Sequence, residues 1–257
     1  MKTLLILLKK DLLEAWRTKK VLILSIVFLF CAVSSPLFAK ITPKLLESMP
    51  SQGGITIKIP EPTYRDAIDQ WVKNVSQFGL LVLLFIGAAA IVEEKNRKTL
   101  ELLLTKPAPR PYIVLSKLKS LFLVTTVLYA IASVIFYVYA ASLFEPFSIA
   151  RFALVDIFMW FYLLAVMVIA VLGSVVASNL AGAIGLNFLS LIVVTAIIPM
   201  VGKLAPYWPS YLMQHYKDVM NQGWNSNYII PLCVELGLMA LFVLASVLIF
   251  QKQEIER

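Results

Sequence analysis

Six long apolar stretches dominate the sequence and leave little choice of fold. Five of them contain no Asp, Glu, Lys or Arg, and the sixth contains one charged residue, Glu235. The hydrocarbon core of a bilayer is about 30 Å thick, and an α-helix needs about 20 apolar residues to cross it. Each stretch is therefore predicted to be a transmembrane helix; the six comprise residues 21–39, 75–92, 120–144, 157–177, 180–202 and 228–250.

The composition excludes other broad classes of protein. The chain has 257 residues, of which 60% are hydrophobic and 15% charged, whereas soluble domains have about 45–50% apolar and about 25% charged residues. This excess of apolar side chains does not fit inside one water-soluble core, and it also excludes intrinsic disorder. We therefore expect an all-α integral membrane protein in which residues 1–257 form a single transmembrane domain.

The distribution of Lys and Arg predicts how these helices are oriented. An even number of spans places both termini on one side, and that side carries 15 of the 23 Lys and Arg residues. Cytoplasmic loops are enriched in these residues. We therefore expect a multi-pass protein of the cell membrane with both termini in the cytoplasm and with loops 40–74 and 203–227 outside. The net charge of +8 then reflects topology and attraction to anionic lipid, and no nucleic-acid partner is expected.

Residues 1–20 are predicted to contain an amphipathic helix that lies in the membrane surface. Apolar residues at helical spacing form one face and cations form the other, with Asp11 and Glu14 at the margin between them. Such a pattern is typical of interfacial helices. The apolar face comprises Leu4, Leu5, Leu8, Leu12, Ala15 and Trp16, and the basic face comprises Lys2, Lys9, Lys10 and Arg17.

The connections between the spans also carry local signals. Thr63 is expected to cap a helix that continues into the second span, and the aromatic loop 203–227 is expected to form two short helices. Ser178 and Asn179 alone join the fourth and fifth spans, which predicts a tight hairpin.

A few polar residues within or beside the spans are candidates for function. Asp156 is expected to be only interfacial, while Asn187 and Thr195 are expected to form interhelical hydrogen bonds. Glu235 lies about two turns into the sixth span, where an ionisable group is costly and suggests function. A carboxyl group that is paired within the bundle or kept protonated is an equally good interpretation, so Glu235 and Asn187 are retained as possible pathway residues.

The segment 93–119 is predicted to hold a short amphipathic helix at the cytoplasmic surface. Asn96 caps it, and Pro107 ends it because the residue before a proline avoids helical geometry. A helix this short is unstable alone, so it must pack on the spans while its charged face meets a soluble partner. Its apolar face comprises Leu100, Leu103 and Leu104, and its polar face comprises Lys98, Glu101 and Thr105.

This segment resembles the loop after the second span in type-2 ABC transporter permeases, the ABC-2-type exporter family. The resemblance rests on Glu94, on the run from Thr99 to Thr105, on Pro107 and Arg110, and on the stretch from Ile113 to Lys117. The number of spans and the N-terminal helix extend it to nearly the whole chain. Lys98 stands where the family usually has Gly.

The resemblance implies a non-catalytic exporter subunit in a bacterial or archaeal membrane. Such permeases form homodimers or heterodimers and bind two cytoplasmic ATPase subunits, whose closure pushes on the short helix and opens a path at the dimer interface. ATP and Mg²⁺ are therefore expected on the partner ATPase, and no cofactor or metal is expected on this chain. The residues implied in coupling are Glu94, Arg97, Lys98, Thr99, Leu100, Glu101, Leu103, Leu104, Pro107 and Arg110.

Other functions remain open at this point. The sequence has no Gly-x-x-x-x-Gly-Lys-Ser/Thr loop for binding phosphates, so it is not expected to hydrolyse ATP. A secondary transporter usually carries more intramembrane charge and visible pseudo-symmetry. A membrane-embedded enzyme needs a nucleophile with its base, a set of metal ligands or paired intramembrane carboxylates. This sequence has one His, and one Glu within the predicted spans, which argues against such a site. The plainer alternative to a coupling helix is that residues 93–119 form an ordinary amphipathic linker.

Overall fold

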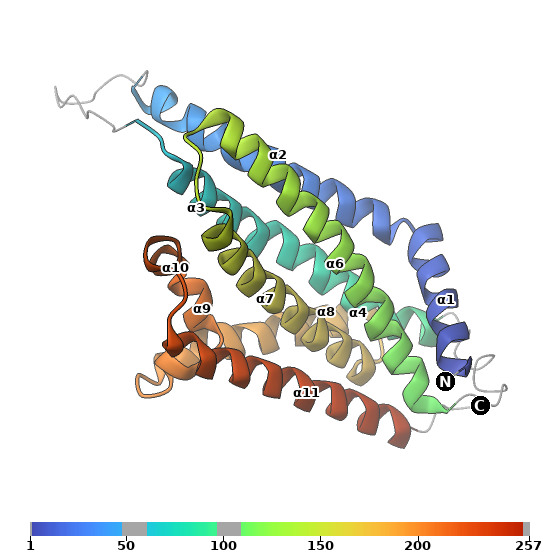
Figure 1. Ribbon diagram of the computed structural model, residues 1–257. Helices are drawn as coiled ribbons and strands as arrows, with labels where there is room; N and C mark the ends of the chain where they lie inside the picture. The colour runs from blue at the N-terminus through green and yellow to red at the C-terminus, as the bar shows by residue number, and fades with distance from the viewer. Residues whose placement is uncertain (1, 48–60, 97–108, 254–257) are drawn as a thin grey trace.

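The computed structural model describes residues 2–47, 61–96 and 109–253, in which the regular elements are all helical (Figure 1). Within these residues, six helices are long and apolar enough to cross a membrane. The prediction of an all-helical fold built on six such helices is therefore confirmed. They comprise Lys20–Pro43, Tyr64–Asn96, Arg110–Leu143, Ile149–Val176, Leu180–Ile197 and Ser226–Lys252.

The individual elements are mostly α-helices, joined by short π-helical and 3₁₀-helical turns labelled η. The long elements are α1 (Lys2–Arg17), α2 (Lys20–Glu47), α3 (Tyr64–Asn74), α4 (Leu80–Asn96), α6 (Arg110–Leu143), α7 (Ile149–Val176), α8 (Leu180–Ile192) and α11 (Ile229–Lys252). The short elements are η1 (Val75–Gly79), η2 (Val193–Ile197), η3 (Ile198–Met200), η4 (Ala205–Tyr207), α9 (Ser210–Gln214), α10 (Tyr216–Gln222) and η5 (Ser226–Tyr228).

The helices differ in length from the apolar stretches that predict them. Helix α6 begins ten residues before residue 120, and α7 begins at Ile149 rather than at 157. A hydropathy pattern marks only the part that suits hydrocarbon, whereas polar flanks continue a helix beyond it. The fifth predicted span is α-helical only to Ile192, and a 3₁₀ turn follows around Pro199, which lacks the N–H that an α-helix needs.

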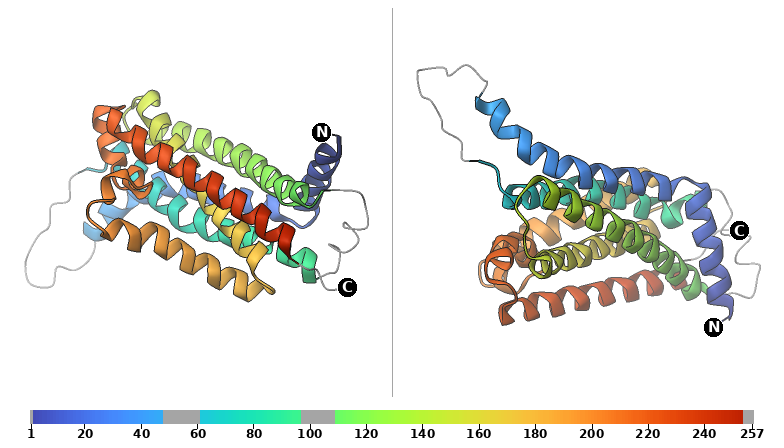
Figure 2. Two further views of the ribbon diagram at one scale, coloured as in Figure 1. Left: turned by 90° about the horizontal axis from the view of Figure 1, so that it is seen from below. Right: turned by 45° about the horizontal axis from the view of Figure 1, so that its top comes forward.

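Helices α4 and α7 form the centre of the bundle. They pack against each other, and the windows of highest hydropathy are most buried in these two spans. Helix α2 lies beside α6 along one side, and α11 runs along the other side (Figure 1). Figure 2 shows α1 turning away from α2 at one end of the bundle, the α1 end; α9 and α10 lie at the opposite end, the α10 end.

Helix α3 continues through η1 into α4, as expected from the sequence. Thr63 precedes α3, and its backbone N–H donates to a carboxylate oxygen of Asp66 at 2.8 Å. This contact satisfies one of the N–H groups left free at a helix start. The buried face of α3 carries Trp71, which stacks on Phe136 of α6 with ring centroids 4.8 Å apart.

Asp156 has a packing role beyond the merely interfacial one expected for it. Its carboxylate accepts hydrogen bonds from the hydroxyls of Tyr129 and Ser133 on α6, at 2.6 and 2.5 Å, and from the Trp71 indole N–H at 3.3 Å. Neighbouring helices therefore supply the hydrogen-bond donors of this half-buried carboxylate. Because these donors belong to α3 and α6 and the carboxylate belongs to α7, this residue holds three helices in register.

Replacing Asp156 by Ala is expected to destabilise the protein by about 1–3 kcal/mol, because three buried donors lose their acceptor. Asp156→Asn, which keeps one acceptor oxygen, should lose less. Thermal unfolding can be followed with a thiol-reactive dye in a Cys233→Ser background. Cys31 is then the remaining thiol, and because it is buried in the folded protein, the dye reacts with it only on unfolding. Glu145→Ala, at an exposed site, is the control. Equal melting of Asp156→Ala and the control would contradict this role.

Candidate functional site

The predicted coupling segment, residues 93–119, begins in the last turn of α4 and continues into the first part of α6. Of the predicted coupling residues, Glu94 and Arg110 are the two described, and they lie at the α1 end of the bundle. The remaining predicted residues lie outside the described part of the chain. These are Arg97, Lys98, Thr99, Leu100, Glu101, Leu103, Leu104 and Pro107.

Glu94 is buried near the end of α4, where it forms ion pairs with residues of α1 and α6. Its Oε1 atom lies 2.9 Å from Nζ of Lys117 on α6 and 2.8 Å from Nζ of Lys10 on α1. Lys117 ends the stretch from Ile113 on which the family resemblance partly rests. The Glu94–Lys117 pair therefore joins α4 and α6, the two helices that the predicted coupling segment connects.

Helix α1 supplies two further carboxylates to the same place. The Nζ atom of Lys117 lies 2.7 Å from Oε2 of Glu14 and 3.3 Å from Oδ1 of Asp11. The hydroxyl of Ser116 donates to the other Asp11 oxygen at 2.6 Å. Lys20, at the start of α2, lies 3.7 Å from both Glu14 and Glu93. We call this group the ion cluster: Lys10, Asp11, Glu14, Lys20, Glu93, Glu94 and Lys117.

The ion cluster is stable because its charges nearly balance. Burial alone would raise the pKa of the Glu14 carboxyl, but attraction to Lys117, Lys20 and Lys10 is stronger in sum and lowers that pKa below its usual 4.5. A lowered pKa means that this carboxylate stabilises the fold above about pH 4.5 and that the contribution is lost as the pH falls. Removing one member would leave its partners buried and uncompensated.

Asp11 is not at the margin of the polar face of α1, as the sequence suggested, whereas Glu14 is half-exposed. Asp11 lies on the buried face of the helix together with Leu7 and Ala15, while Leu5 and Trp16 are exposed. Burial of Asp11 is favourable because Lys117 and Ser116 approach it from α6. The exposed apolar residues remain available for the membrane surface, in keeping with an interfacial helix.

Helix ends are tied together beside the ion cluster. Lys95, adjacent to Glu94, donates to the carbonyl oxygens of Val175 and Ala177 at the end of α7. Arg110 donates to the carbonyl oxygens of Gln251 and Gln253, at 3.0 and 2.9 Å, at the end of α11. Cations at a helix C-terminus satisfy its free carbonyls and match the negative end of the helix dipole.

The α1 end therefore has the connections of a transmission site. Its salt bridges join α4 to α1 and α6, while Lys95 and Arg110 add the ends of α7 and α11. These contacts flank the residues between Asn96 and Arg110 on both sides. No catalytic chemistry is needed for such a role.

The two intramembrane candidates have different surroundings. Asn187 is buried on α8 and donates to the carbonyl oxygen of Ala170 on α7 at 3.1 Å, so the interhelical hydrogen bond expected for it is confirmed. The same expectation for Thr195 is wrong, because its hydroxyl donates to Leu191 one turn earlier in its own helix. Glu235 is buried and lines a pocket at the α10 end.

Sequence reasoning missed most members of the ion cluster as functional residues. Asp11 and Glu14 lie three residues apart on one helical face, which is a signal for a shared partner. The sequence does not say which helix that partner comes from. Lys117 was part of the family pattern, but its pairing with Glu94 depends on α4 and α6 lying together, which only the structure shows.

Comparisons with known proteins agree with this architecture. Over 156 residues the chain is 23% identical to an uncharacterized transmembrane protein, YxlG, of Bacillus subtilis. That alignment covers 60% of this chain and only 60% of the length of the relative. Residues 5–254 match the family described as ABC-2 family transporter protein. Since this match covers nearly the whole sequence, the chain belongs to the ABC-2 family of transporter proteins.

Proposed function

We propose that this chain is the membrane-spanning permease subunit of an ATP-binding-cassette exporter. It would move a substrate across or out of the membrane, driven by ATP hydrolysis on a separate ATPase chain. The observation that carries the proposal is the Glu94–Lys117 ion pair, at 2.9 Å, together with the helix-end contacts beside it. These contacts flank the segment that resembles a coupling helix, where a force from outside the bundle would be applied.

The proposed complex contains two permease chains and two ATPase subunits in the cell membrane. Both termini of the permease lie in the cytoplasm, which agrees with the excess of Lys and Arg at the α1 end. The ATPase subunits bind there and carry ATP and Mg²⁺. This chain contributes no nucleotide chemistry, and the ABC-2 family supplies the precedent for a division of labour between permease and ATPase.

In the proposed mechanism, the ATPase contacts the charged face of the segment, with Glu101, Lys98 and Arg97 as docking residues. Leu100, Leu103 and Leu104 hold its apolar face against the bundle. Thr99 and Pro107 are the other positions of this segment that match the family pattern. Closure of the ATPase subunits moves the segment. The ion cluster passes this movement to α1, α4 and α6, and Lys95 and Arg110 pass it to α7 and α11.

A charge reversal at the docking face tests this assignment. Glu101→Arg is expected to reduce the ATPase that copurifies with the permease by about tenfold or more, because a reversed charge disrupts the electrostatic complementarity of a docking face, and to abolish ATP-driven transport. Folding and insertion should be unchanged. Glu145→Arg, at an exposed site on the opposite side in the proposed topology, is the control. Normal ATPase recovery and transport with Glu101→Arg would contradict the assignment.

A further inference from the structure

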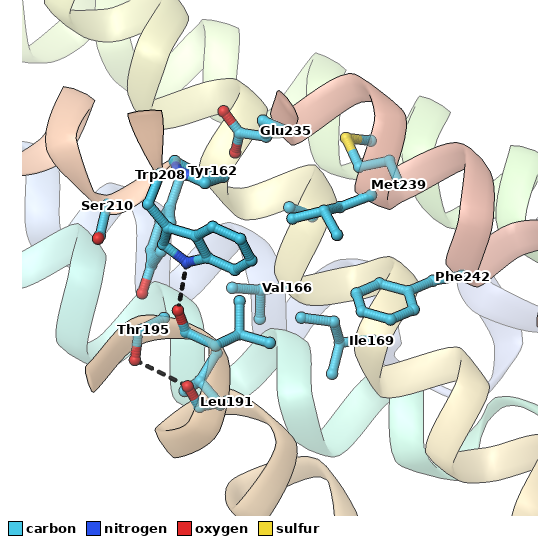
Figure 3. Close-up of a pocket in the computed structure, with 14 residues that line it drawn as sticks. Tyr162, Val166, Ile169, Leu191, Thr195, Trp208, Ser210, Glu235, Met239 and Phe242 are labelled. Atoms are coloured by element: carbon cyan, nitrogen blue, oxygen red, sulfur yellow. Dashed lines mark hydrogen bonds between the residues drawn. The ribbon is translucent and has the colours of Figure 1, made fainter. Parts of the chain in front are cut away.

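A pocket at the α10 end lies between segments that are far apart in the sequence. One wall comes from α7, a second from α8 and η2, a third from the connection at residues 208–210, and a fourth from α11 (Figure 3). The residues that matter for its chemistry are Tyr162, Thr195, Trp208, Ser210, Glu235 and Phe242. The pocket lies at the other end of the bundle from the ion cluster, so the coupling role does not account for it.

Glu235 is the one charged residue in the lining of this pocket. Its side chain is only 3% exposed, and it forms no hydrogen bond or ion pair with the described part of the chain. It lies six residues after the start of α11, or about 9 Å along the helix axis at 1.5 Å per residue. A carboxylate without a counter-ion at such a depth is unfavourable, whereas Asp156, also on a membrane-spanning helix, has three donors.

Ser210 provides a second polar group without a partner. Its hydroxyl oxygen is buried and has no hydrogen bond among the described residues. Two of its neighbours are satisfied by backbone: the Trp208 indole donates to the carbonyl of Val194 at 2.6 Å, and the Thr195 hydroxyl donates to Leu191 at 2.8 Å. Figure 3 shows the Ser210 hydroxyl pointing away from Glu235, so the carboxyl of Glu235 is the polar group that this pocket offers to a ligand.

The remaining lining is apolar and aromatic, and the space is small. The cavity volume is about 40 Å³, which holds roughly three water-sized groups. This is room for a compact cationic head with its first carbon atoms, but not for a bulky headgroup. Aromatic side chains such as Trp208, Tyr162 and Phe242 attract a cation placed over their faces, and they also accept hydrocarbon.

We propose that this pocket binds the ammonium end of a hydrophobic primary amine, with Glu235 as its counter-ion and the aromatic lining around its first carbon atoms. An ammonium group supplies both the missing positive charge and three N–H donors. An alcohol offers no charge to the carboxylate, and an anion is repelled by it. This proposal deepens the proposed function, since it names a substrate class for the permease. Binding of the amine does not depend on that function, and only the role of the amine as cargo rests on it.

Direct binding tests the proposal. The probe is radiolabelled decylamine, added to the full chain with its copurifying subunits in phosphatidylcholine nanodiscs, with binding to empty nanodiscs subtracted. Saturable binding of one decylamine per permease chain is expected, and an excess of decanol should not displace it. Binding that does not saturate, or displacement by decanol as readily as by unlabelled decylamine, would overturn the proposal.

One substitution, with its control, locates the site. Glu235→Gln keeps the shape of the side chain and is expected to weaken decylamine binding by about 30-fold, the value of a charge-assisted hydrogen bond. Glu145→Gln, at an exposed site, should have no effect. Unchanged binding by a folded Glu235→Gln protein would refute the assignment. If that variant does not fold, the comparison of decylamine with decanol on the unsubstituted protein decides.

The outcome is separable from that of the proposed function, because no ATP and no transport enter the measurement. Decylamine binding by a chain that has no ATPase partner would refute the permease mechanism and leave the pocket assignment intact. An ATPase partner combined with no saturable decylamine binding would refute the pocket assignment alone.

Discussion

Replacing Lys117 by Met should destabilise the protein by about 3–5 kcal/mol, the usual cost of removing one partner from a buried ion pair. The Lys117 side chain is 5% exposed and its ammonium contacts Asp11, Glu14 and Glu94. These three carboxylates have oxygens within 4.8 Å of one another, so without the ammonium they repel one another at close range. The expected result is a large fall in folded protein recovered from membranes and in its melting temperature.

Lys119→Met is the matched control for this experiment. It makes the same substitution two residues further along α6, where the side chain is exposed, and should leave the melting temperature almost unchanged. Adding Glu94→Gln to Lys117→Met should restore part of the stability, since it removes one of the carboxylates left without a cation. Similar behaviour of Lys117→Met and Lys119→Met, or no recovery in the double variant, would contradict a cluster held together by charge.

Replacing Gly87 by Leu should be at least as damaging, for a steric reason. Gly87 lies on α4 where this helix contacts α7, and a Cβ atom added there would lie 2.4 Å from Cβ of Ala170. Neither atom can move without moving its helix, and these two helices form the centre of the bundle. Overpacking usually costs about 1–3 kcal/mol, so a whole Leu side chain at this contact is expected to exceed about 3 kcal/mol, with Gly87→Ala showing an intermediate loss.

The control for Gly87 is Gly185 on α8. A Cβ atom added to Gly185 meets no atom within 4 Å, so Gly185→Leu should fold normally, and Gly185→Ala should gain up to about 1 kcal/mol from helix propensity alone. Both series can be compared by thiol-dye melting through Cys31. Equal melting temperatures for Gly87→Leu and Gly185→Leu would show that α4 and α7 do not approach as closely as described.

Much of the fold can be predicted from the sequence because a bilayer imposes simple rules. Five stretches without a charged residue, and a sixth with only Glu235, each have the length needed to cross hydrocarbon, and each corresponds to a helix of the structure. The turn between α7 and α8 and the cap at Thr63 were predictable from local chemistry. The helix ends were not, because polar flanks extend α6 and α7 beyond the apolar stretches.

The site was less predictable, because its geometry depends on which helices are neighbours. Asp156 has the same sequence context as an interfacial residue, yet it accepts hydrogen bonds from α3 and α6. Asp11 has the spacing of a residue at the edge of an amphipathic helix, yet Lys117 of α6 lies opposite it. Side-chain periodicity gives the face of a residue on its own helix but not the partner that the face meets.

The measurement that tests the permease account most directly is purification of the tagged chain from its native host in a mild detergent, followed by mass spectrometry of the proteins that copurify. A soluble ATPase is expected in stoichiometric amount, together with a second permease chain, either another copy or a paralogue. Recovery of the chain alone, without an ATPase even after chemical crosslinking through Lys98 or Lys106, would contradict it and would favour a transporter that does not use ATP.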